Sequence, residues 1–81
     1  MSKFAKLFER NGNQVVVMAT QTGDGFPCIH FIMDIGGAVA EPKFEYKEGA
    51  WDKRDAGFDL VDEDAAFSLR DSLAAQYGDL L

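Results

Sequence analysis

The chain has very little of what catalysis and metal binding require. Its 81 residues include one cysteine, one histidine and three serines. A single cysteine excludes an internal disulfide and a multi-cysteine metal site, and a serine triad would have to use His30. No nucleophile elbow, HExxH zinc motif or phosphate-binding glycine loop occurs. We therefore predict a protein that is not an enzyme, with no catalytic residue, cofactor or metal.

Long hydrophobic runs are also missing. The longest mainly apolar stretches, 15–19 and 29–33, fall far short of the roughly 20 residues that span a bilayer. Met1 is not followed by an apolar run of signal-peptide length. The length allows one domain. We expect a single domain over residues 1–81, located in the cytoplasm and without a membrane partner.

Positive charge is scarce in the last third of the chain. Residues 55–81 carry seven acids against Arg70 alone, a net charge of −6, which equals that of the whole protein. Such a surface repels nucleic acid and favours partners with a basic surface, including proteins that hold nucleic acid. The alternative is that the carboxylates serve only solubility.

Valines, threonines and turn signals predict an antiparallel sheet in the middle of the chain. Residues 14–22 read as a strand, Asp24-Gly25 as a two-residue hairpin loop, and Phe26–Ile35 as the returning strand. A third strand is expected over about Val39–Lys47, with Phe44 and Tyr46 pointing to the core. One face of the returning strand is uniformly apolar and is expected to face the core: Pro27, Ile29, Phe31, Met33 and Ile35.

Helices are predicted at both ends of the chain. Phe4, Leu7 and Phe8 recur at helical spacing in residues 2–10, which predicts a short helix capped by Ser2 and ended by the Asn-Gly-Asn at 11–13. Residues 48–61 lack a clear pattern, although 58–61 would suit a fourth strand.

Asp62 is a good N-cap for the second helix, which is expected to end near Tyr77 with Gly78 following it. The residues expected to pack on the sheet are Ala66, Leu69, Leu73 and Tyr77, widened by Phe67, Arg70 and Ala74. The predicted fold class is α+β: a three- to four-stranded antiparallel sheet with the C-terminal helix on one face and a short N-terminal helix.

Cys28 and His30 share the second face of the returning strand. Their β-carbons should lie roughly 6–7 Å apart, but no helix N-terminus or cation is expected there to activate the thiol. Asp34 is too distant along the strand to complete a metal site. The expected neighbours on the facing strand are Val15, Val17, Ala19 and Gln21. We interpret the pair as part of a scaffold strand, whose face becomes a candidate binding surface if nothing covers it.

Two further patterns are rejected. Residues 52–63 place glycine and glutamate as an EF-hand loop does, but Arg54 and Ala56 stand where oxygen ligands are needed. In residues 43–47 the lysines and aromatics alternate, so they lie on opposite faces and do not form a single-strand binding platform. Direct nucleic-acid binding is therefore not expected.

Protein recognition remains. An aromatic residue beside arginine is typical of binding hot spots, and the acids that follow resemble a row of phosphates. The residues expected to contact a partner are Trp51, Lys53, Arg54, Asp55, Phe58, Asp59, Asp62, Glu63, Asp64 and Asp71. For Trp51 the alternative is that its ring closes the open end of the core.

In size, acidity and lack of catalytic residues, the chain resembles the small accessory inhibitors that phages encode against host proteins or defence complexes. The resemblance implies a non-enzymatic protein that inhibits a macromolecular partner in the host cytoplasm through a surface that mimics nucleic acid. The alternative is a small structural or assembly module that works as a homodimer through its sheet edge or N-terminal helix.

Overall fold

The computed structural model describes the backbone of residues 4–80 and the side chains of residues 4–76. Its elements are β1 (Ala5–Arg10), β2 (Asn13–Gln21), β3 (Pro27–Ile35), β4 (Ala38–Ala40), β5 (Lys43–Glu45), α1 (Trp51–Leu60) and α2 (Glu63–Leu80). The antiparallel sheet has the order β1-β2-β3-β4, and β5 continues along the same side of β3 as β4.

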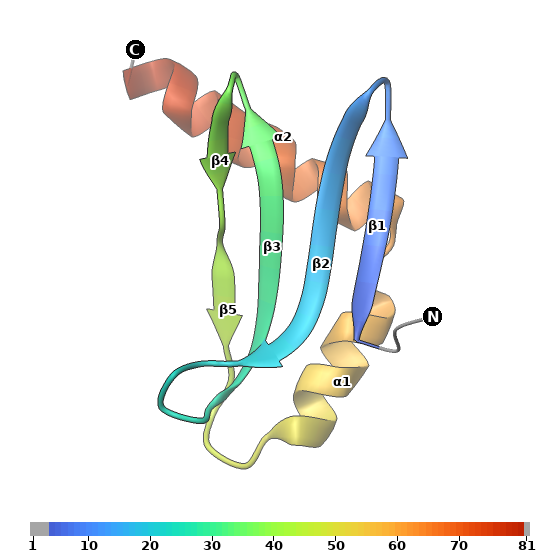
Figure 1. The fold of residues 1–81 in the computed structure, drawn as a ribbon, viewed down its shortest axis with the longest axis vertical. Helices are drawn as coiled ribbons and strands as arrows, with labels where there is room; N and C mark the ends of the chain where they lie inside the picture. The colour runs from blue at the N-terminus through green and yellow to red at the C-terminus, as the bar shows by residue number, and fades with distance from the viewer. Residues whose placement is uncertain (1–3, 81) are drawn as a thin grey trace.

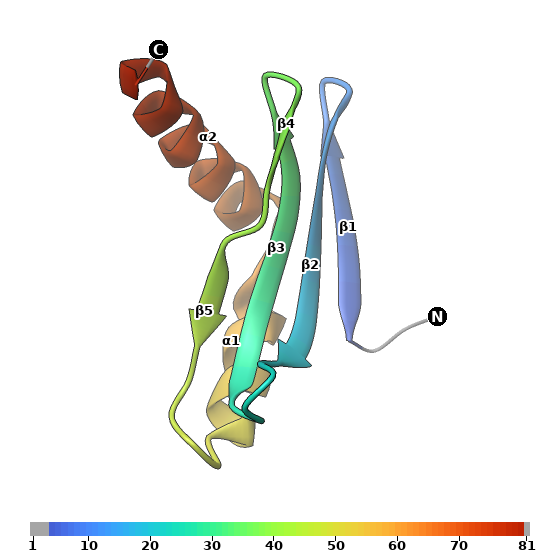
Figure 2. The ribbon, with the colours of Figure 1, turned by 60° about the vertical axis from the view of Figure 1, so that its left-hand side comes forward.

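Both helices lie on one side of the sheet (Figure 1), and the turned view shows no helix or strand on the other side (Figure 2). We call the two sides the covered face and the open face. The α+β class with an antiparallel sheet is confirmed, although the sheet has more strands than predicted. Within residues 4–80, neither helix is apolar enough along its length to cross a bilayer.

The predicted N-terminal helix is wrong, because residues 5–10 form β1. Asn11 (φ 53°) and Gly12 (φ 81°) make a two-residue turn into β2. Both lie in the left-handed region that such a hairpin turn requires, and Asn-Gly is the pair that most readily adopts it.

The apolar spacing that suggested this helix is divided between the two faces of β1. Phe8 packs against the core, whereas Leu7 points to the open face and is 61% exposed. The segment also fits the alternation of a strand, and pairing with β2 satisfies backbone groups that a nine-residue helix could hold only weakly. Ser2, the expected cap, lies outside the described residues.

A helix also forms where none was predicted. α1 occupies residues 51–60, and no fourth strand forms at 58–61. Only Arg54 and Phe58, one turn apart, are buried in it. Gly57 lies inside the helix with its Cα against the Tyr46 hydroxyl, where any β-carbon would overlap the oxygen.

The predicted third strand is divided into β4 and β5 by Pro42, whose carbonyl accepts the Phe31 N–H at 2.9 Å. Phe44 meets Phe31 edge to face, with ring centroids 5.6 Å apart, and Tyr46 packs at the margin of the core. The inward orientation of both aromatics is confirmed, although Phe44 stays 47% exposed.

α2 begins as predicted, with Asp62 Oδ1 accepting the Ala65 N–H at 2.8 Å. Ala66 and Phe67 are fully buried. The helix continues to residue 80, so Gly78 lies within it instead of following it. The side chain of Tyr77 lies outside the described part of the chain.

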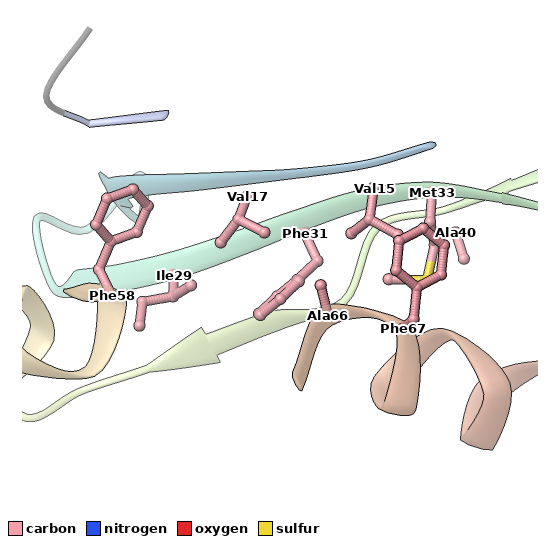
Figure 3. Close-up of a cluster of buried hydrophobic side chains, with 9 residues drawn as sticks. All are labelled: Val15, Val17, Ile29, Phe31, Met33, Ala40, Phe58, Ala66 and Phe67. Atoms are coloured by element: carbon pink, nitrogen blue, oxygen red, sulfur yellow. The ribbon is translucent and has the colours of Figure 1, made fainter. Parts of the chain in front are cut away.

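The core lies between the covered face and the two helices (Figure 3). Its buried members are Val15, Val17, Ile29, Phe31, Met33, Ala40, Phe58, Ala66 and Phe67. The predicted core face of the returning strand is confirmed, since Pro27, Ile29, Phe31 and Met33 are buried and Ile35 is half-buried.

The predicted register between β2 and β3 is wrong by one residue. Gln21 lies opposite Pro27, so the loop holds the five residues 22–26. Thr22 organises this loop, with its hydroxyl accepting the Phe26 N–H at 3.1 Å. Because side chains alternate with a period of two, the shift exchanges the two faces of β2. Val15 and Val17 belong to the covered face, and the strand neighbours of Cys28 and His30 are Thr20 and Met18.

Candidate functional site

The helices carry their acidic side chains on the outer surface of the molecule. On α1, Asp52, Asp55 and Asp59 are exposed and follow one side of the helix at spacings of three and four residues. Asp62, Glu63, Asp64 and Asp71 continue the exposed row through the junction and along α2. We call these seven carboxylates the acidic surface.

Two of the three cations of residues 51–76 turn inward. Arg54 is 8% exposed and donates to the Thr20 carbonyl at 2.9 Å and to Asp55 Oδ1 at 2.6 Å. Arg70 reaches the Asp34 carbonyl at 3.2 Å across the sheet layer. Lys53 alone is exposed. Arg54 thus pairs with one of the seven carboxylates, and the outward surface of α1 and α2 keeps a net negative charge.

Some of the aromatic and basic residues that we expected to contact a partner are buried, and others are exposed. Phe58 is 4% exposed and belongs to the core, and the burial of Arg54 also removes that side chain from the surface. Trp51 remains 38% exposed at the start of α1, with the Arg54 guanidinium 5.1 Å from its ring centroid. Of Trp51, Lys53, Arg54 and Phe58, only Trp51 and Lys53 are therefore exposed to a partner.

One apolar residue of the acidic surface was missed by sequence reasoning. Leu60, the last residue of α1, is 80% exposed between Asp59 and Asp62. Only the helical geometry of residues 51–60 places it there, and the sequence pattern of that segment does not predict a helix.

β1 fixes the position of the acidic surface on the sheet. Lys6 Nζ donates to the Phe58 carbonyl at 2.6 Å and to the Val61 carbonyl at 3.1 Å, at the C-terminal end of α1 where a cation is favoured. Arg10 bridges Glu63 Oε2 at 2.8 Å and Asp64 Oδ1 at 2.7 Å. These hydrogen bonds raise the pKa of the Arg10 guanidinium above its ordinary value.

The surroundings of Cys28 and His30 do not activate the thiol. Cys28 is 1% exposed, and burial raises the pKa of its thiol, which opposes thiolate formation. His30 Nε2 lies 3.2 Å from Glu41 Oε1, without the alignment of a hydrogen bond. In the described part of the chain, no three histidine, cysteine, aspartate or glutamate residues come together as a metal site.

The open face is a second candidate site, and it is apolar at its centre. Leu7, Val16 and Ile32 lie side by side across β1, β2 and β3. Met18 lies in the next row, and Val39, on β4, is 67% exposed. Val16, Ile32 and Val39 also line a hollow of about 380 Å³ beside the two hairpin turns. The alternation of apolar residues on both faces of β2 and β3 was the available signal for this surface.

Comparison of the chain with protein-family models, with curated proteins and with solved structures finds no match. The function is therefore inferred from the geometry of these two surfaces.

Proposed function

We propose that this protein is a non-enzymatic binding protein that recognises a basic surface of a macromolecular partner through the acidic surface of α1 and α2. The observation that carries the proposal is the distribution of charge on the helices: seven carboxylates face outward, whereas Arg54 and Arg70 donate to backbone carbonyls of the sheet. Arg54 and Arg10 pair with three of the carboxylates, Asp55, Glu63 and Asp64, and the other four have no arginine or lysine partner within 2.8 Å in the described residues.

The spacing of the carboxylates supports a partner that holds nucleic acid. Residues three and four apart on a helix have β-carbons about 5–6 Å apart, so Asp52, Asp55 and Asp59 form a regular row of negative charge. A groove lined by lysine and arginine attracts such a row by the same electrostatics that attract a phosphate backbone. Leu60 adds an apolar contact within the row.

Occupation of such a groove would exclude nucleic acid from it. We therefore extend the proposal to inhibition: the protein acts in the cytoplasm, that of the host cell if a phage encodes it, against a nucleic-acid-handling or defence complex. Because like charges repel, the protein itself is expected to leave nucleic acid unbound.

The test is capture of partners from a nuclease-treated cell lysate on the immobilised protein, at about 50 mM and about 500 mM salt. The wild-type protein should retain basic proteins at low salt and release them at high salt. The double variant D52K/D59K should retain at least about tenfold less.

A matched control is D24K/E48K, which makes the same change of net charge outside the helices, in the β2–β3 loop and before α1. It should retain the same proteins as the wild type. Undiminished capture by D52K/D59K, or capture that does not depend on salt, would contradict the proposal.

A further inference from the structure

The open face has the anatomy of a protein interface. Leu7, Val16, Met18 and Ile32 form an apolar centre. Leu7 is exposed and the other three are partly buried. His30 lies beside this centre, opposite Met18. Other polar and charged side chains surround it: Glu9, Gln14, Thr20, Asp34, Lys43 and Glu45. An apolar patch that remains partly exposed within a polar rim marks an interaction surface, because an antiparallel sheet that meets water on one face normally carries polar residues there.

The edges of the sheet are protected against pairing, and the open face is not. On β1, Lys6 and Arg10 point inward to the helices, and inward charges on an edge strand discourage addition of another strand. The opposite edge is interrupted at Pro42 and offers only the three-residue strands β4 and β5. Association through the sheet is therefore favoured at the face, not at an edge.

Charge allows a second copy of this chain as the occupant. A net charge of −6 makes copies repel one another, but the acidic surface lies on the helices, on the other side of the sheet. Two open faces can meet with the acidic surfaces turned away from each other. Their separation then exceeds the Debye length of about 8 Å at physiological salt.

We propose that the open face packs against the open face of a second copy, about a two-fold axis that runs along the strands between β2 and β3. The product is a four-layer α/β/β/α dimer with an acidic surface on each outer side. The proposal is independent of the proposed function.

The axis brings complementary residues together. It places β2 of one copy over β3 of the other, so Val16 meets Ile32 of the second copy and Met18 meets His30 of the second copy. At the rim, Gln14 meets Asp34 of the second copy. The Gln14 amide already donates one hydrogen to Glu9 Oε2 at 3.0 Å, which leaves one for the second copy.

The available area fits a weak, reversible dimer. Four strands about 4.8 Å apart and eight residues at about 3.4 Å give a face of roughly 500 Å² per copy. The total of about 1,000 Å² is at the lower limit of specific interfaces, so we expect a weak dimer that forms only at high protein concentration.

Sedimentation equilibrium of the purified full chain, from about 1 µM to about 1 mM, tests the proposal. The wild type should pass from monomer to dimer over this range. I32K places a charge at the apolar centre and should raise the dissociation constant at least about tenfold. A75K adds the same side chain at an exposed position of α2 and should behave as the wild type.

Two variants of exposed Gln14 test the orientation and serve if I32K does not fold. Q14E opposes Asp34 of the second copy and should weaken the dimer several-fold, whereas Q14K should strengthen it. A wild type that stays monomeric at every concentration overturns the proposal and leaves the face to a different protein. A dimer that I32K and Q14E leave unchanged also overturns it. Slowed amide exchange at residues 5, 7 and 9 in such a dimer would indicate pairing through β1.

Discussion

The two faces of the sheet are built from the same strands but have different surroundings. On the covered face, Ile29 and Val17 are almost completely buried under the helices. On the open face, Ile32 and Val16 lie on the same strands, directly opposite each other, and are only partly buried. Hydrophobicity therefore does not distinguish the faces, and the position of the helices does.

The middle of β2 and of β3 therefore carries apolar residues on both faces, as strands buried on both sides do. Such strands occur where both faces of a sheet are covered, whereas a sheet with one wet face alternates apolar with polar residues. The described fold supplies one cover, and the second copy proposed above would supply the other.

The sharpest test of the difference between the covered face and the open face uses two isoleucines of β3. I29A empties a position that is 4% exposed and should lower the free energy of unfolding by about 2–5 kcal/mol. I32A removes the same atoms from the open face and should cost about 1 kcal/mol or less in dilute solution. Urea denaturation of both variants measures the difference.

Measuring the stability of I29A and I32A at several protein concentrations gives a second test. If the open face is covered in a dimer, the cost of I32A should grow with concentration, because dimer formation stabilises the folded state of the wild type. The cost of I29A should remain nearly constant. Equal costs for the two variants in dilute solution would show that the two faces are equally buried.

A smaller effect is expected from the lysines on the two faces. K6M keeps most of the aliphatic chain but removes the ammonium group that the Phe58 and Val61 carbonyls accept from, and should cost about 1–2 kcal/mol. K43M changes an exposed lysine of the open face and should stay within about 0.5 kcal/mol of the wild type. Thermal unfolding measures both, and an unaffected K6M would show that β1 does not depend on this contact.

The smallest effect concerns how closely the helix layer approaches the sheet. Replacing glycine by alanine inside a helix usually stabilises it by about 0.5–1 kcal/mol. G57A should instead destabilise the protein, because the new β-carbon overlaps the Tyr46 hydroxyl.

In a Y46F background the sign should reverse. The nearest atoms to that β-carbon are then Ile29 Cδ1 and the ring carbon of residue 46, each at 3.4 Å, which is ordinary contact. A double-mutant cycle by urea denaturation measures this coupling. A G57A variant that is stabilised in the wild-type background would show that the helix moves away from Tyr46 without cost.

Patterns that depend on a single element were predictable from the sequence. The apolar row of β3 from Pro27 to Ile35 identified the covered face, and the carboxylate of Asp62 identified the start of α2. In both cases one local rule, alternation or capping, decides the structure without information from elsewhere in the chain.

Where a sequence pattern fits both a helix and a strand, tertiary contacts decide between the two. Residues 4–8 fit both helical spacing and strand alternation, and the Asn-Gly turn decided for the strand because β2 was there to pair with. α1 has no side-chain cap, and the glycine at position 57 weakens its propensity. The close approach of Tyr46 explains the glycine at position 57. A local sequence pattern does not reveal that contact.

The register between β2 and β3 could not be read from its loop. Asp24-Gly25 signals a two-residue turn, but the hydroxyl of Thr22 holds a longer loop closed. The error of one residue in the register assigned Val15 and Val17 to the same face as Cys28 and His30, although they lie on the covered face. The residues of β2 that form the open face were therefore not predicted.

The contacts of β1 with the helix junction also impose an order on folding. The sheet joins neighbours in sequence through short hairpins, which form quickly because little loop entropy is lost. The contact from Lys6 to the Phe58 carbonyl closes a separation of 52 residues. We therefore expect the helices to dock last. Until they do, both faces of the nascent sheet would be exposed together, and we expect the chain to be most prone to aggregate in that interval.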